Sequence, residues 1–312
     1  MEIITDISLP LALNRPVVTI GTFDGVHLGH QAIFGVMKKH ASALGGDTVV
    51  VTFHPHPRLV LNQHVYLLST REEKRSAFAE AGISHLVEIP FTREFSQHSA
   101  EDFIRMIAGL IRPEVFVIGY DHGFGRDRKG SINQLYHFGG EFGYKVVQVD
   151  ELIAGNHHVS SSVVRWLLQE GDVEQAAALL GREYTITGQV IRGNQIGKLI
   201  GYPTANLYVD DPNKLVPSMG VYASRVYHNG RTFNGMTNIG MRPTINAYKL
   251  TIETNIFGFD EDIYYETITV QLVKRIRNEK KFGSLDLLKS QLQNDRETAA
   301  RILSFSNKPA EG

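Results

Sequence analysis

Two histidines near the start of the chain are the residues best suited to chemistry. His27 and His30 stand three positions apart in the stretch GTFDGVHLGH, residues 21–30. At that spacing, two side chains in the first turn of a helix lie on the same face. Two imidazole rings on one face can donate hydrogen bonds to a phosphate on which negative charge develops. The stretch therefore suggests phosphate chemistry, and the alternative is that both rings only pack the helix.

A strand and a helix are expected on either side of these histidines. Residues 16–20 form a β-branched run typical of a buried strand, and residues 31–40 carry apolar side chains at helical spacing. Between them, Gly21 and Gly25 permit a tight turn and the close approach of a ligand. The free N–H groups at the start of the helix attract anions. This arrangement predicts a nucleotide phosphate in the turn.

The composition of the chain limits the kinds of protein it can be. Its 312 residues suffice for two domains with their own cores, and 42% apolar with 21% charged residues is typical of a soluble protein. No window approaches about 18 apolar residues and the first residues are acidic, so neither a transmembrane helix nor a secretory signal is expected. The lack of cysteine excludes disulfides and thiolate chemistry and fits a cytoplasmic location. A net charge of −1 gives no general attraction to nucleic acid.

The first part of the chain alternates strand and helix patterns. After the opening unit, strands are expected at residues 48–53, 85–90, 115–119 and 145–149, and helices at residues 70–81, 99–111 and 131–142. Thr70 with Glu73, and Ser99, are placed to cap two of these helices. This alternation predicts a parallel, doubly wound sheet that binds ligands at the carboxyl ends of its strands. We therefore expect a Rossmann-like domain over residues 1–183.

Other polar residues in this domain are further candidates. Asp121 opens a glycine-rich, charged segment, and Ser161 and Arg165 begin a later helix. Such groups suit a triphosphate, and the alternatives are a solvated loop and ordinary N-capping. His54 and His56 form a conceivable metal pair, but no third ligand is evident, so a metal is not favoured there.

Short strand patterns with frequent turns replace this alternation from about Tyr184. Strands are expected at residues 184–191, 220–227, 250–257 and 265–272. The pair Asn229-Gly230 signals a hairpin, residues 238–244 are expected to form an ordered loop, and residues 284–303 a helix. This part, residues 184–312, is therefore predicted to be an antiparallel β-barrel with a C-terminal helix.

A loop in this second domain has the composition of a phosphate-binding loop. Gly193, Gly197 and Lys198 make it glycine-rich and cationic, although their spacing is not that of a Walker A motif. Shortly after it, Thr204 and Asn206 stand two positions apart, so both polar ends point the same way on an extended segment. A hydroxyl and an amide oxygen are ligands suited to Mg²⁺ that also binds nucleotide phosphates.

Glu253 is the candidate general base of the second domain. It lies in the strand expected at residues 250–257, where a carboxylate could take a proton from a substrate hydroxyl. A single glutamate on a strand is more often a surface residue, so this position alone does not decide the matter.

These strings together resemble the prokaryotic FAD synthetase family, the bifunctional riboflavin kinase/FMN adenylyltransferases. The similarity rests on GxFDGxHxGH at residues 21–30 and on PTAN at residues 203–206, and it covers nearly the whole chain. It implies that residues 1–183 transfer AMP from ATP to FMN. It also implies that residues 184–312 form a six-stranded barrel with a C-terminal helix and phosphorylate riboflavin.

The resemblance also implies roles for individual residues. His27 and His30 would contact the ATP phosphates, and Glu253 would take the proton of the ribityl 5′-hydroxyl. Thr204 and Asn206 would hold Mg²⁺. The other residues implied to bind nucleotides are Gly21, Phe23, Asp24, Asp121, Ser161, Arg165, Gly193, Gly197 and Lys198. The substrates would be ATP, riboflavin and FMN, no nucleic acid or membrane partner is expected, and the oligomeric state is left open.

Several positions depart from the family's usual pattern, among them Ser162, where the family often has threonine and the hydroxyl is kept. Lys198 stands where the family usually has arginine, so the charge is kept but the bidentate geometry is lost. Tyr265 stands where the family has glycine. Because a tyrosine does not readily take a positive φ, we expect the turn there to be reshaped.

Two alternative functions are weighed against this one. Another His-x-Gly-His adenylyltransferase, acting on a pantetheine or nicotinamide nucleotide, would explain nothing after residue 184. A flavin-binding sensor that has lost catalysis would be expected to lack His27, His30, Asn206 or Glu253, and all four are present.

Overall fold

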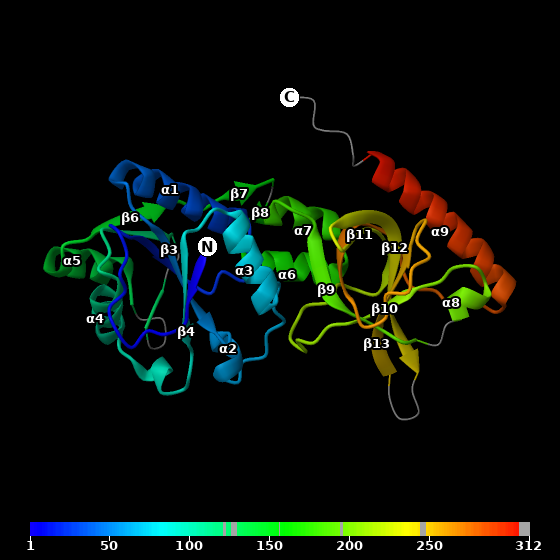
Figure 1. Ribbon diagram of the computed structural model, residues 1–312, viewed down its shortest axis with the longest axis horizontal. Helices are drawn as coiled ribbons and strands as arrows, with labels where there is room; N and C mark the ends of the chain where they lie inside the picture. The colour runs from blue at the N-terminus through cyan, green and yellow to red at the C-terminus, as the bar shows by residue number, and fades with distance from the viewer. Residues whose placement is uncertain (121–122, 126–129, 156, 194–195, 244–247, 306–312) are drawn as a thin grey trace. The chain divides into compact units, whose positions relative to one another are not determined.

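The structure is a computed structural model that describes residues 1–120, 123–125, 130–155, 157–193, 196–243 and 248–305. The chain divides into two compact units, Met1–Ser161 and Ser162–Gly312 (Figure 1). Within the described residues, no helix combines the length and the apolar character needed to cross a membrane.

A six-stranded parallel sheet forms the first unit. Its strands are β1 (Glu2–Ile4), β2 (Val17–Ile20), β3 (Thr48–His54), β4 (His85–Pro90), β5 (Val115–Gly119) and β6 (Lys145–Val149). Their order across the sheet is β1-β4-β3-β2-β5-β6, and every neighbouring pair is parallel. The chain thus extends from β2 through β3 and β4, then returns to the other side of β2 with β5 and β6. Ligands of open sheets bind beside such a switch in strand order, so the predicted doubly wound sheet is confirmed with its switch next to β2.

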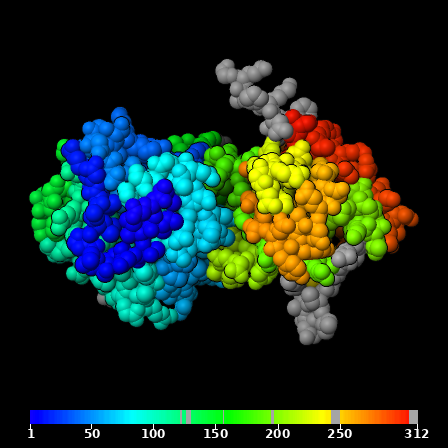
Figure 2. Space-filling model, in the orientation of Figure 1, coloured from blue at the N-terminus to red at the C-terminus, as the bar shows by residue number. Residues whose placement is uncertain are grey.

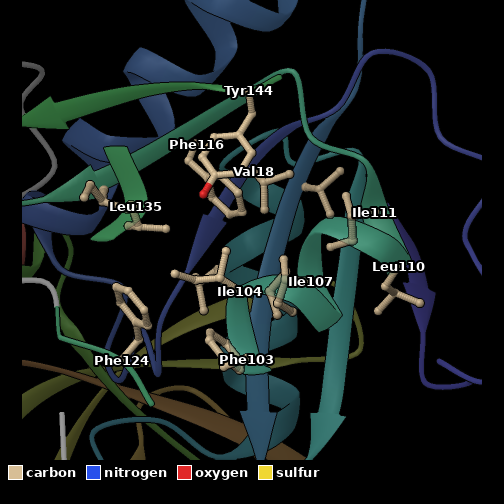
Figure 3. Close-up of a cluster of buried hydrophobic side chains, with 14 of the residues drawn as sticks. Val18, Phe103, Ile104, Ile107, Leu110, Ile111, Phe116, Phe124, Leu135 and Tyr144 are labelled. Atoms are coloured by element: carbon tan, nitrogen blue, oxygen red, sulfur yellow. The ribbon is translucent and has the colours of Figure 1, made fainter. Parts of the chain in front are cut away.

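Helices cover both faces of this sheet. Alternate residues of its strands therefore lie in core clusters on opposite sides. On one face, Val18 of β2 lies in a core cluster with α4 (Ala100–Ile111) and α5 (Ile132–Phe142), which Figure 3 shows. On the other face, Val17 lies in a cluster with α1 (Leu28–Leu44) and α3 (Arg71–Glu80). Burial on both faces explains why the strand reads as a continuous apolar run.

Local signals place the ends of these helices. Thr70 and Glu73 form the predicted capping box at the start of α3, and Ser99 forms one with Asp102 at the start of α4. The edge strand β1 was not expected from the sequence, and the N-terminal segment, blue in Figure 2, lies at the surface. The short elements of the unit are α2 (Pro57–Val60), η1 (Phe95–Gln97), β7 (Ile153–Ala154) and β8 (His157–His158).

A closed antiparallel barrel forms the core of the second unit, as predicted. Its strands are β9 (Tyr184–Ile191), β10 (Ala205–Tyr208), β11 (Gly220–His228), β12 (Arg231–Pro243), β13 (Tyr248–Ile256) and β14 (Thr267–Arg277). They pair in the order β10-β13-β12-β11-β14-β9. The short helix α8 (Ile196–Leu199) lies between β9 and β10, and the expected hairpin at Asn229-Gly230 joins β11 to β12.

The C-terminal helix α9 (Leu285–Phe305) packs against this barrel. Ala299 and Leu303 are fully buried in a cluster with Met236 of β12. Asp295 is also buried and binds Arg277 of β14 at 2.7 Å. The helix is therefore held by apolar contact and by one buried ion pair.

The expectation of an ordered loop at residues 238–244 is wrong for its described part. Residues 238–243 lie within β12, where Asn238 pairs with Val221 on one side and with Glu253 on the other. Backbone pairing on both sides outweighs the local preference of the Asn, Gly and Pro residues in this stretch. Thr244 lies outside the described residues.

Two helices precede the barrel, α6 (Ser161–Glu170) and α7 (Val173–Leu180). Arg275 of β14 donates a hydrogen bond to the carbonyl oxygen of Glu170 at 3.2 Å. Contacts of this kind group the helices with the barrel, so the compact units divide earlier than the boundary expected after Glu183. Whether that residue separates the two activities stays a prediction.

Candidate active sites

The turn between β2 and α1 has an unusual backbone. Phe23, Gly25 and Val26 take positive φ values of 49°, 83° and 43°. A Cβ on Gly25 would lie 2.7 Å from Cδ1 of Leu68, so both the conformation and the space require glycine there. A Cβ on Gly21 would lie 3.0 Å from the Phe23 ring, so Gly21 makes room for that ring. The sequence predicted the tight turn but not which groups it accommodates.

Asp24 fixes this turn to the segment that leads into α3. Its buried carboxylate accepts hydrogen bonds from the Leu68 amide at 2.9 and 3.0 Å and from the Ser69 amide at 3.2 Å. The carbonyl oxygen of Asp24 accepts a hydrogen bond from Ser161 Oγ at 2.9 Å. Asp24 and Ser161, both predicted to bind a nucleotide, therefore hold the turn in shape.

His27 and His30 lie side by side at the start of α1. Their rings stack with centroids 3.6 Å apart and an interplanar angle of 21°. The His30 ring also packs edge to face with the Phe23 ring, with centroids 5.1 Å apart. His27 is buried, and Gly29 leaves space for its ring, since a Cβ there would lie 3.2 Å from it. The prediction that both rings share one face is confirmed. Their catalytic role stays a prediction.

Helix α3 brings three cations toward the carboxyl ends of the strands. Lys74 and Arg75 lie three and four positions after Arg71, which places both on the side of the helix that Arg71 occupies. Lys74 Nζ donates hydrogen bonds to the carbonyl oxygen of Thr22 and to Thr52 Oγ1, both at 3.2 Å. The spacing of the three cations after a capped helix start places them on one face, but it does not show that Lys74 contacts Thr22.

The two arginines of this face bind one buried carboxylate, Glu88 of β4. Arg71 Nη2 lies 2.7 Å from Glu88 Oε2, and Arg75 contacts the same oxygen. Burial raises the pKa of Glu88, but hydrogen bonds from Arg75 and Arg71 outweigh it and lower the pKa to about 2. The arginines are thus engaged with the protein, and Lys74 is the cation directed at the turn.

An aromatic cluster stands at the ends of β3 and β4. The ring centroids of Phe53, Phe91 and Phe95 are 5.7 to 6.0 Å apart, and each side chain is half-buried. Half-buried aromatic rings offer a stacking surface for a planar ring system. In the sequence, the one signal for these residues is that Phe53 lies near the end of β3 and Phe91 directly follows β4.

Other predicted residues of the first site are placed differently. Asp121 lies outside the described residues, and Arg165 lies on α6, beyond the division between the units. His56 caps α2, where its Nδ1 accepts a hydrogen bond from the Arg58 amide at 3.2 Å. The residues that the structure describes contain no group of three or more side chains able to hold a metal.

A second group of predicted residues meets on the barrel. Asn206 of β10 pairs directly with Glu253 of β13. A Cβ on Gly193 would lie 2.3 Å from Asn206 Nδ2, so the loop after β9 passes against this amide. A Cβ on Gly197 would lie 2.2 Å from the carbonyl oxygen of Tyr202 and 3.6 Å from Thr204 Oγ1. Gly193, Gly197, Thr204, Asn206 and Glu253 thus form one cluster, and Lys198 is exposed on α8 beside it.

Glu253 has a charged partner within this cluster. Arg242 Nη2 of β12 lies 2.7 Å from Glu253 Oε1, and Thr251 Oγ1 lies 3.4 Å from the same oxygen. The Glu253 side chain is only 14% exposed, so its orientation is set by these contacts. The sequence placed Arg242 in a loop and gave no reason to pair it with Glu253.

The turn that contains Tyr265 is not reshaped to avoid a positive φ. Tyr265 takes φ 68°, in the left-handed region. Its amide donates to the Val190 carbonyl oxygen at 2.7 Å, and its own carbonyl oxygen accepts from Gln189 Nε2 at 3.0 Å. These bonds hold a conformation that costs a non-glycine residue about 1–2 kcal/mol.

Comparison with known proteins agrees with this two-part architecture. A family model for FAD synthetase matches residues 10–163, and one for riboflavin kinase matches residues 180–303. The chain is 36% identical to the bifunctional riboflavin kinase/FMN adenylyltransferase of Bacillus subtilis over 93% of each chain. It is 33% identical to the protein of that name from Escherichia coli K12 over 94% of each chain.

A solved structure shares the whole fold. It is the crystal structure of a protein from Streptococcus pneumoniae that is named a macrolide-efflux protein. The match covers 96% of this chain and 99% of that one, with 30% sequence identity and a TM-score of 0.88. The combination of a parallel sheet unit and a barrel unit in one chain is therefore found in a known structure.

Proposed function

The chain belongs to the family of bifunctional riboflavin kinase/FMN adenylyltransferases, and from this membership we propose how its residues divide the two reactions. The enzyme phosphorylates riboflavin to FMN with ATP and then transfers AMP from ATP to FMN, forming FAD and pyrophosphate. The observation that carries the assignment is that both family models match one chain, each over the unit with the appropriate fold. Adenylyl transfer belongs to the parallel-sheet unit and riboflavin phosphorylation to the barrel.

Adenylyl transfer takes place at the turn after β2. A phosphate oxygen of FMN attacks the α-phosphorus of ATP, the bond from that phosphorus to the bridging oxygen breaks, and pyrophosphate leaves. Negative charge then grows on the leaving group. His27 and His30 stand at the start of α1, where their ring N–H groups and the helix N-terminus stabilise that charge. Gly21, Phe23, Asp24 and Ser161 keep the turn in shape, and Asp121 and Arg165 are proposed to complete the nucleotide site.

The flavin ring of FMN is proposed to pack against the aromatic cluster. Phe53 lies near the carboxyl end of β3, the neighbour of β2 in the sheet, and Phe91 and Phe95 follow β4, the next strand along. A planar apolar ring gains contact area against such side chains. The phosphate and the ring of FMN are thereby assigned to neighbouring strand ends.

Phosphorylation of riboflavin takes place at the barrel cluster. Glu253 takes the proton of the ribityl 5′-hydroxyl as its oxygen attacks the γ-phosphorus of ATP, and ADP leaves. Arg242 holds the carboxylate in position through their ion pair. Gly193, Gly197 and Lys198 are proposed to bind the nucleotide phosphates.

Mg²⁺ is proposed to bind at Thr204 and Asn206. The Thr204 hydroxyl and the Asn206 amide lie against the same glycine loop, and hard oxygen donors of this kind, few in number, fit a magnesium ion that also binds phosphates. When bound, the ion neutralises charge on the nucleotide. A cytoplasmic location is proposed on the ground that ATP is a substrate of both reactions.

The decisive test follows both products in time. Purified protein is incubated with riboflavin, ATP and Mg²⁺, and the flavins are separated by chromatography. We expect FMN to form first and FAD to follow, with both steps reduced when Mg²⁺ is removed by a chelator. Failure to convert riboflavin, or accumulation of FMN without FAD, would contradict the corresponding assignment.

The division of the activities at Glu183 is tested by fragments. We expect residues 184–312 alone to make FMN from riboflavin. Residues 162–312 are the matched control, since they keep the contact between Arg275 and the Glu170 carbonyl oxygen. The longer fragment should have the higher melting temperature. Activity in the longer fragment only would show that residues 162–183 belong with the kinase unit.

A further inference from the structure

The carbonyl oxygen of Thr22 is held by groups from two other elements. It accepts hydrogen bonds from Lys74 Nζ of α3 at 3.2 Å and from Thr52 Oγ1 of β3 at 3.3 Å. Lys74 Nζ also lies 3.2 Å from Thr52 Oγ1, so the three groups form a closed triangle. Thr52 is fully buried. One carbonyl group in the turn that leads to His27 is therefore fixed from two directions.

Fixing this carbonyl also fixes the amide that follows it. In a trans peptide, the C=O and the next N–H point in opposite directions. The Phe23 N–H therefore faces away from Lys74 and Thr52, and it donates to no other residue that the structure describes. Phe23 takes φ 49°, a conformation that side chains avoid unless their surroundings hold it. The triangle thus sets the direction of a backbone donor at the edge of the proposed phosphate site.

The charge of Lys74 supports a role beyond holding the carbonyl oxygen. Holding a neutral carbonyl oxygen does not require a cation, and an ammonium group taken out of water is costly unless charged partners compensate. Burial lowers the pKa of Lys74 from 10.5, and the charges of Asp24 and Glu88 raise it. Arg71 and Arg75 are occupied by Glu88, so among the cations on this face of α3, Lys74 is the one directed at the turn.

We propose that Lys74 is a positioning residue for adenylyl transfer, which holds the Thr22–Phe23 peptide so that its amide and the histidines after it meet the phosphates of ATP in a fixed geometry. This inference rests on the proposed function of the first unit. It assigns Lys74 an effect on the rate of FAD formation and none on the phosphorylation of riboflavin.

The test uses Lys74→Met in the full-length protein, which keeps the side chain's length and removes its charge and donors. We expect kcat for FMN adenylylation to fall about 10- to 100-fold. KM values for ATP and FMN should stay within about threefold, since substrate contacts are unchanged. Riboflavin kinase activity of the same preparation should match the wild type, which shows that the barrel unit is intact, and an unchanged melting curve shows that the first unit is folded. Lys74→Arg, which keeps a charged donor, should recover most of the loss.

A matched control comes from another lysine with the same kind of bond. Lys38 Nζ of α1 donates to the carbonyl oxygen of Ala81 at 3.0 Å, at an exposed position. Lys38→Met removes that bond without touching the turn and should leave both activities unchanged. Equal losses of FAD formation in the Lys38 and Lys74 variants would show a general effect of lost lysine bonds and overturn the proposal.

Thr52→Val shows whether Lys74 acts through the Thr22 carbonyl. If it does, Thr52→Val also lowers kcat for FAD formation, and the double variant is little worse than Lys74→Met alone. A normal rate in Thr52→Val, or a Lys74→Met variant that only raises KM for ATP, would mean direct substrate binding and overturn the positioning role. A wild-type protein that makes no FAD would refute the proposed function, whereas a fully active Lys74→Met would refute this inference alone.

Discussion

The two turns proposed to bind phosphates differ in how they are held. In the first unit, Phe23 and Val26 are 4% and 1% exposed, and Asp24 is bound by two backbone amides. In the second unit, Lys198 is exposed and Leu199 is 85% exposed on a helix of four residues. The first turn is thus fixed by neighbouring residues, whereas the side chains of Lys198 and Leu199 beside the second turn are open to solvent.

The difference follows from where each fold places its proposed reactive groups. In the parallel sheet, His27 and His30 come after the end of β2, so a loop and a helix start must hold them. In the barrel, Asn206 and Glu253 are paired residues of neighbouring strands, so the backbone ladder sets their distance. The proposed reactive groups therefore stand on a bonded loop and helix start in the first unit and on paired strands in the second.

The largest expected effect is the loss of the kinase step in Glu253→Gln. Removal of a general base lowers the rate about 10²–10⁴-fold. Because the strand pairing is made by the backbone, the variant should fold, and its rate of FMN-to-FAD conversion is the internal control. Near-normal FMN formation would remove Glu253 from the mechanism.

His30→Ala should have the next largest effect, on the other activity. Loss of one donor to developing charge costs about 10²–10³-fold in kcat, by analogy with oxyanion-hole variants. FMN should then accumulate while FAD formation is suppressed. The melting temperature must be measured on the same preparation, because a loss of rate without a loss of stability supports catalysis. A lowered melting temperature with a full FAD rate would mean that His30 only packs against His27 and Phe23.

The bonding of the first unit should also make its stability depend on acid pH. Glu88 has a pKa of about 2 in the folded protein and 4.5 as its ordinary value. The stabilisation is present above about pH 4.5 and is lost as the pH falls toward about 2, because the unfolded chain takes up the proton first. The shift corresponds to about 3 kcal/mol.

Urea unfolding of the wild type and Glu88→Gln at pH 6 and pH 3 measures this dependence. The two proteins should differ less at the lower pH. Glu174→Gln is a control, since its ion pair with Lys274 is about half exposed on both sides and should contribute little. An unchanged difference between wild type and Glu88→Gln at both pH values would contradict the assignment.

The smallest effect is expected at the exposed turn. Lys198→Ala should change the free energy of unfolding by less than about 0.5 kcal/mol, because the side chain is exposed. It should raise KM for ATP in the kinase reaction about fivefold, which corresponds to about 1 kcal/mol of lost phosphate binding. A large loss of stability would show that this turn is as tightly built as the first.

Local patterns predicted the parts of the fold that depend on neighbouring residues. The apolar run before Gly21 and the capping pair Thr70 and Glu73 act within a few positions, and both elements formed as expected. Asn238 and Arg242 were assigned to a loop because their strand exists only through pairing with β11 and β13.

The sites show the same limit. The spacing of His27 and His30, or of Thr204 and Asn206, can be read along the chain. The bond from Lys74 to Thr22 spans 52 positions and that from Arg242 to Glu253 joins two strands, so neither follows from spacing. Tyr265 was misjudged because its left-handed turn depends on bonds to Val190 and Gln189.

The closure of the barrel affects how the chain responds to destabilising substitutions. A closed barrel has no free strand edge, whereas the parallel sheet ends in β1 and β6, which are three and five residues long. Unpaired strand edges recruit other chains, and short length and charged residues, such as Glu2 and Lys145 here, discourage that recruitment. Substitutions that destabilise the parallel sheet should therefore lead to aggregation, whereas substitutions confined to the barrel should first lower kinase activity.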